Sequence, residues 1–269
     1  MFEKLRTFSL PEPNVSDTSH RRTGKFLARS RHDLDFVSSE VLDMSVINQE
    51  QEQPRRFPTY SKGEVWADAA AHVIGLLFGV VATVALIVTA STTNHFLLIF
   101  GASLYGLGLL AMFSCSAAYN LCPPSDTKEF LRRLDHAAIF LMIAGTYTPL
   151  LLNRIGGEWG LGLLTFVWSV AIVGALMKIV FPRRWEMLSI ALYLGLGWSI
   201  VIAINPMLQA LATNNLVLIG AGALIYTIGV VFHMWERLPY QNAIWHWLVL
   251  AAAACHYWAI LNEVAIAAT

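Results

Sequence analysis

The chain has 269 residues, of which 56% are hydrophobic and only 13% are charged. A soluble domain carries about 25% charged residues, so this composition excludes an ordinary soluble domain and predicts an integral membrane protein. The formal net charge of zero says little about partners. We expect membrane lipids and no nucleic acid.

The first 60 residues differ from the rest of the chain. They hold nine of the 18 basic and nine of the 18 acidic residues. Polar stretches such as residues 16–22 bury too little apolar surface to fold alone. We therefore predict a largely disordered cytosolic arm over residues 1–60, or a tail with no role of its own. The membrane domain is predicted over residues 61–269.

Seven apolar runs follow, each near the ~20 residues that a bilayer core requires. They cover residues 65–90, 96–121, 134–152, 159–181, 187–204, 215–235 and 244–266. Short polar or proline-containing breakers separate them, among them Asn205-Pro206. The pattern predicts an all-α integral membrane protein, a seven-transmembrane helix bundle.

Basic residues near the ends of the runs predict the orientation. With the N-terminus in the cytosol, only Arg154 lies on the outer side. The inner side then holds Lys62, Lys128, Arg132, Arg133, Lys178, Arg183, Arg184 and Arg237. Basic residues concentrate on the cytosolic side of membrane proteins. We therefore predict a cytosolic N-terminus and an outside C-terminus, in the plasma (inner) membrane of a bacterial source.

In this topology, the polar residues of several runs lie at the cytosolic end. They are Glu64, His72, Ser116, Asn120, Asp135, His136, Asn242 and His246. Isolated polar groups in hydrocarbon cost several kcal/mol, so they are expected to face one another or a cation. Three protein donors with one open position suit a catalytic zinc ion. A neighbouring Ser116 hydroxyl is placed to hydrogen-bond an oxyanion or an attacking water.

Each of these residues also has a structural interpretation. Asp135 suits the start of a helix, where the macrodipole favours an acid. His136 points to another face of that helix and suits a packing role, and His246 suits a hydrogen-bonded histidine of the bundle. Ser116 is able to bond back within its own helix. His256 lies about 15 Å farther along its helix than His246, which favours a separate buried hydrogen bond.

Several blocks resemble the hemolysin III family, the bacterial branch of the progestin and adipoQ receptor (PAQR) group. The most specific is Leu-Asp-His-Ala-Ala-Ile-Phe at 134–140, followed by Ala-Gly-Thr-Tyr-Thr-Pro at 144–149. Ser-Ala-Ala-Tyr-Asn at 116–120 and Ala-Ile-Trp-His at 243–246 are similar to further family blocks. The resemblance covers roughly residues 60–262.

The resemblance implies a zinc site near the cytosolic leaflet. Its ligand positions correspond to Asn120, Asp135, Asn242 and His246 in this chain. Two of the four are amides, which are poor zinc ligands. Asp135 and His246 remain as the metal residues that the resemblance implies, with Ser116 as an assisting group. Substitute donors outside those ligand positions are His72, His136 and Cys122.

Two functions from different classes fit these observations. The first is a non-catalytic sensor or regulator of the membrane, or a haemolysin-like pore-former, with a remodelled metal site. The alternative is a zinc-dependent intramembrane hydrolase of a lipid amide, similar to the ceramidases that the resemblance implies. In it, Asn120 and Asn242 orient water beside the ion.

Overall fold

The computed structural model describes residues 57–268, so residues 1–56 of the predicted arm lie outside the described part of the chain. From residue 57 to residue 268 the secondary structure is helical, with no strand. Seven helical stretches are long and apolar enough to cross a membrane, which confirms the predicted bundle. Five of them are single α-helices: α2 (Lys62–Ser91), α3 (Phe96–Leu121), α5 (Gly157–Val180), α8 (Thr213–Met234) and α9 (Gln241–Ala268).

The other two spans contain irregular turns. α4 (Asp126–Leu150) continues as a π-helix, η1 (Leu151–Ile155). The fifth span joins α6 (Glu186–Trp198), a 3-10 segment η2 (Ser199–Ala203) and α7 (Ile204–Ala210). Whether the N-terminus faces the cytosol stays a prediction.

Side-chain caps explain where two spans begin. At α2 a capping box joins Ser61 and Glu64: the Glu64 amide donates to Ser61 Oγ, and the Ser61 amide donates to Glu64 Oε2 at 2.8 Å. At α4 the Ser125 hydroxyl accepts from the Lys128 amide at 3.1 Å. This cap starts α4 eight residues before the predicted apolar run. The run did not include these residues because the first two turns of the helix are polar.

The interpretation of Asn205-Pro206 as a helix breaker is wrong. Both residues lie in the first turn of α7, and the helical stretch continues to Ala210. A proline is tolerated in a first helical turn because the amide that it lacks has no intrahelical acceptor there. The 3-10 segment η2 interrupts the α-helical hydrogen bonds, so α7 begins as a new helix and places the proline in its first turn.

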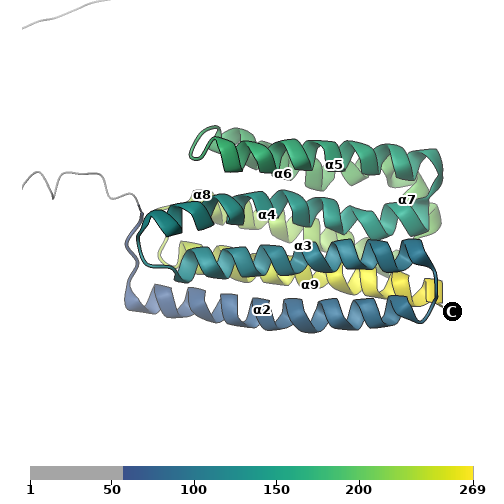
Figure 1. The fold of residues 1–269 in the computed structure, drawn as a ribbon, viewed down its shortest axis with the longest axis horizontal. Helices are drawn as coiled ribbons and strands as arrows, with labels where there is room; N and C mark the ends of the chain where they lie inside the picture. Colours follow the sequence, from purple (N-terminus) through teal and green to yellow (C-terminus); the bar gives the residue numbers. More distant parts are fainter. Residues whose placement is uncertain (1–56, 269) are drawn as a thin grey trace, which may run out of the picture. The chain divides into compact units, whose positions relative to one another are not determined.

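The helices run alongside one another and alternate in direction (Figure 1). α2 packs between α3 and α9, α3 packs on α4, α4 on α5, and α8 on α9. α6 lies beside α4, α5 and α8. The N-terminal ends of α2, α4, α6 and α9 therefore share one end of the bundle with the C-terminal ends of α3, α5 and α8, and this end is the left side of Figure 1.

Apolar side chains fill the middle of the bundle. Leu86, Tyr105, Leu109 and Ile260 belong to one buried cluster and are at most 1% exposed. Close backbone approach is needed in places: a Cβ on Gly106 would lie 2.5 Å from Thr83 Cγ2 of the neighbouring helix. Small residues at such contacts are typical of membrane helix pairs.

A buried polar cluster holds the other end of α9. Glu263 is 1% exposed, and its Oε2 lies 2.6 Å from Arg154 Nε. Its Oε1 accepts from Asn215 Nδ2 at 2.7 Å and from the Ala212 amide at 3.1 Å. These contacts join α9 to η1, to the start of α8 and to the turn before it. They therefore set the position of the helix that carries His246.

Candidate metal centre

Two donors of the candidate centre come from one face of α2. Asp68 and His72 are four residues apart, which places their side chains on the same side of a helix. Both are buried, with 8% and 3% of their surface exposed. His72 Nε2 lies 3.3 Å from Asp68 Oδ2. This part of α2 is in its second and third turns, close to the end where α9 also begins.

The third donor is His246 in the second turn of α9. Its Nδ1 is 2.5 Å from Asp68 Oδ1, and 10% of its side chain is exposed. The His72 and His246 rings lie 4.3 Å apart between centroids, tilted by 56°. One ligand atom from each of Asp68, His72 and His246 lies within 4.8 Å of the other two. These three side chains form a candidate metal-binding cluster, here called the DHH cluster.

The chemistry of the DHH cluster fits a divalent transition metal. His72 Nε2 is near Asp68 but poorly directed toward it, so this buried nitrogen has no hydrogen-bond partner. A buried polar atom without a partner is costly, and a cation would give it one. Two imidazoles and one carboxylate are donors that zinc accepts, with a fourth position left open.

An amide pair borders the cluster where the resemblance places two ligands. Asn242 Nδ2 donates to Asp68 Oδ2 at 3.0 Å and lies 3.2 Å from Asn120 Oδ1. Asn120 Nδ2 in turn donates to the Ser116 carbonyl oxygen at 3.0 Å. The two amides therefore orient the carboxylate of the cluster and join α9 to α3. Both are committed to hydrogen bonds.

Ser116 and Asp135 lie on the other side of His246. The Ser116 hydroxyl is 3.5 Å from His246 Nε2. The Asp135 carboxylate lies near this hydroxyl and interacts with it. Asp135, which the resemblance implies as a ligand, is therefore near the centre but is not one of the three converging donors.

The remaining predicted residues have structural partners. Glu64 caps α2, and its Oε1 also accepts from the Tyr240 amide at 2.9 Å. His136 Nδ1 donates to the Arg132 carbonyl oxygen at 2.8 Å. His256 lies ten residues after His246 on α9, and its Nε2 donates to the Ile219 carbonyl oxygen at 3.1 Å.

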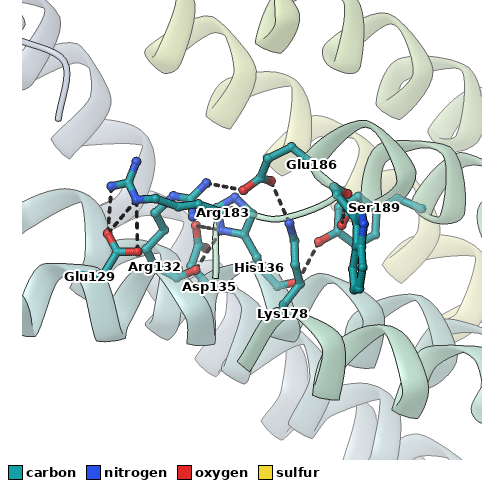
Figure 2. A network of polar contacts seen from close by, with 10 residues as sticks. Glu129, Arg132, Asp135, His136, Lys178, Arg183, Glu186 and Ser189 are labelled. Carbon is teal, nitrogen blue, oxygen red and sulfur yellow. Dashed lines mark hydrogen bonds and ion pairs between the residues drawn. The ribbon is translucent and has the colours of Figure 1, made fainter. Parts of the chain in front are cut away.

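A network of ion pairs surrounds His136 on α4 (Figure 2). Glu186 accepts from Arg132 Nη2 and from Lys178 Nζ, each at 2.7 Å. Arg183 Nη2 donates to Glu129 Oε2 at 2.8 Å. The network fastens α4 to the end of α5 and the start of α6. It therefore holds the helix that carries Asp135.

Comparisons with known proteins identify the family. A family model described as "Haemolysin-III related" matches residues 64–257. The chain is 35% identical over 195 residues to the hemolysin-3 homolog of Bacillus subtilis (strain 168), covering 72% of this chain and 92% of the relative. It is 34% identical over 210 residues to hemolysin-3 of Bacillus cereus, covering 78% and 95%. The chain belongs to the haemolysin III-related family.

More distant similarity extends to an animal protein. The human monocyte to macrophage differentiation factor is 32% identical over 165 residues, covering 58% of this chain and 67% of that protein. No solved structure matches the chain. These relatives and the seven spans establish a multi-pass integral membrane protein of the haemolysin III/PAQR family, and the bacterial relatives support the plasma membrane.

Sequence reasoning missed Asp68, the central residue of the DHH cluster. The matched region contains the whole cluster, yet no ligand position that the resemblance implies falls on α2. One signal was available: Asp68 and His72 form an acid and an imidazole at helical spacing inside an apolar run. An intramembrane carboxylate is itself a reason to expect a partner.

Proposed function

We propose that this haemolysin III-related protein is a metal-regulated membrane protein whose DHH cluster holds a zinc ion. The observation that carries the proposal is the convergence of Asp68, His72 and His246 within 4.8 Å. Asp68 and His246 are 178 positions apart in the chain, so only the folded bundle assembles the three donors. Imidazole nitrogens together with a carboxylate favour zinc over magnesium or calcium.

An ion at this position would connect the first and last spans. Asp68 and His72 lie on α2, and His246 lies on α9. A ligand that binds only the folded state stabilises it, by about 2.7 kcal/mol at a free concentration of 100 times Kd. Metal occupancy would therefore tighten one end of the bundle. This favours a membrane regulator that responds to metal, in which the ion itself carries out no catalytic step.

The filled interior speaks against a wide pore through a single chain. Hemolysin-3 of Bacillus cereus carries a name that refers to haemolysis. In this chain, large apolar side chains such as Tyr105 and Leu109 are fully buried along the middle of the bundle. A water-filled channel would need that space, so we favour regulation over pore formation.

Metal analysis of purified protein tests the regulator. We expect about one zinc per chain in wild type, a higher melting temperature with zinc than with chelator, and loss of both effects in His72→Gln. His95→Gln is the matched control, because His95 is exposed at the start of α3. A wild-type protein that contains no transition metal and does not respond to zinc would refute the proposal.

A second candidate function is a metal-dependent hydrolase of a lipid amide. It is favoured because three protein donors leave a position for water and because the Ser116 hydroxyl lies 3.5 Å from His246 Nε2. Bound zinc would supply a water of lowered pKa, which Ser116 is placed to orient. Lipid mass spectrometry tests this function: ceramide turnover should require zinc and disappear in His72→Gln. Turnover that is unchanged after chelation excludes it.

A further inference from the structure

Asp68 and Ser116 each lie next to one of the two ring nitrogens of His246. Asp68 Oδ1 is 2.5 Å from His246 Nδ1, and Ser116 Oγ is 3.5 Å from Nε2 of the same ring. A carboxylate on one ring nitrogen and a serine hydroxyl on the other are the relations of an Asp-His-Ser triad, which is recognised by geometry and not by order in the sequence. A longer serine–histidine distance is common in unliganded sites.

The triad and the metal centre exclude each other. With a hydrogen on Nδ1, His246 donates to Asp68, and its Nε2 lone pair is free to accept from Ser116. If Asp68 and His246 Nδ1 held an ion, that hydrogen would be displaced and Nε2 would carry the hydrogen instead. The imidazole is then no longer a base toward Ser116.

We propose that in the metal-free protein Ser116 is the nucleophile of an acyl-transfer site for carboxylic esters of membrane lipids, and that zinc binding turns it off. The zinc-dependent part rests on the proposed function. His246 acts as the base, and Asp68 holds the ring in the required tautomer. A lipid substrate is inferred because Ser116 lies within a membrane-length helix, five residues before its end.

The reaction needs no redox partner. The Ser116 oxygen forms a bond to the carbonyl carbon while its hydrogen moves to His246 Nε2. The ester carbon–oxygen bond then breaks, the alcohol leaves with that hydrogen, and an acyl-serine remains. Water adds to the acyl carbon with His246 as base and releases the fatty acid and the free hydroxyl.

Neighbouring groups suit this role. Asn120 Nδ2 is 3.5 Å from Ser116 Oγ, which is near enough to donate to a developing oxyanion after a small shift. The Ser116 hydroxyl has one hydrogen, and His246 Nε2 is placed to accept it.

A covalent probe tests the proposal on the full chain in lipid nanodiscs. Protein treated with chelator is incubated with an alkyl fluorophosphonate, and the adduct is mapped by peptide mass spectrometry. We expect an adduct on Ser116 that is absent in Ser116→Ala and unchanged in Ser114→Ala. Ser114 is an exposed serine on the same helix. Asp68→Asn should lower labelling by at least about tenfold, and zinc should block it in wild type.

The outcomes separate this proposal from the preceding one. Zinc binding at the DHH cluster without any Ser116 adduct in the chelated, folded protein overturns the triad and leaves the metal site standing. A Ser116 adduct in a protein that binds no zinc overturns the metal site and supports the triad alone. An adduct that forms equally well with zinc bound overturns the exclusion between them. A melting curve for each variant shows that it is folded.

Discussion

Removing the Glu263 side chain should destabilise the end of the bundle that lies opposite the DHH cluster. Glu263→Ala deletes a carboxylate that is 1% exposed and leaves Arg154 and Asn215 without their acceptor. Removing one partner of a buried ion pair costs about 3–5 kcal/mol. Arg154 is 25% exposed and keeps a 2.9 Å hydrogen bond to the Ala210 carbonyl oxygen. We therefore expect a loss near the lower bound, about 3 kcal/mol.

Thermal unfolding in a mild detergent measures this loss. For a domain of this size, 3 kcal/mol corresponds to a fall in Tm of roughly 6–12 °C. Glu263→Gln should fall by less, because its amide oxygen still accepts from Asn215. Glu158→Ala is the matched control, since Glu158 is exposed in the first turn of α5. A Tm of Glu263→Ala within about 2 °C of wild type would refute the reasoning.

Three further predictions concern packing and the site. Gly106→Ala should lower the free energy of unfolding by about 1–3 kcal/mol by overpacking against Thr83. Gly162→Ala should not lower it, because nothing lies within 4 Å of its new Cβ. Equal Tm values for the two variants would contradict the close approach of α2 and α3. Asn120→His/Asn242→His should bind zinc at least about tenfold more tightly than wild type by competition with a chromogenic chelator, because it adds two imidazoles beside Asp68; unchanged affinity would show that the amides do not border the ion. Glu186→Ala should lower Tm more than Glu236→Ala, because it leaves Lys178, with 2% of its side chain exposed, unpaired; identical curves would mean that the network in Figure 2 adds no stability.

The seven spans were predictable because long apolar runs have few alternatives in a membrane protein. Their ends were less predictable. α4 begins at Asp126 because Ser125 caps it, although its first turns are too polar to belong to an apolar run. The fifth span passes Pro206 because a 3-10 turn restarts the helix there, and a proline alone does not reveal this.

The sequence predicted how far along their spans the site residues lie, but not which face each helix turns toward its neighbours. The positions of Ser116, Asn120, Asn242 and His246 near one end of their spans predicted that they lie close together, and hydrogen bonds join them. Asp68 was missed because its partner His246 is on the far end of the chain. Which face α2 turns toward α9 depends on packing of the whole bundle, and a single sequence contains no direct measure of it.

The central claim is that Asp68, and not Asp135, completes the metal site. Zinc affinity of purified wild type, Asp68→Asn and Asp135→Asn, measured side by side in one chelator competition, tests it most directly. We predict binding weakened roughly 100-fold or more in Asp68→Asn, and by less than about tenfold in Asp135→Asn, because Asp135 is not one of the three converging donors. The opposite order, with tight binding in Asp68→Asn and its loss in Asp135→Asn, would contradict the account.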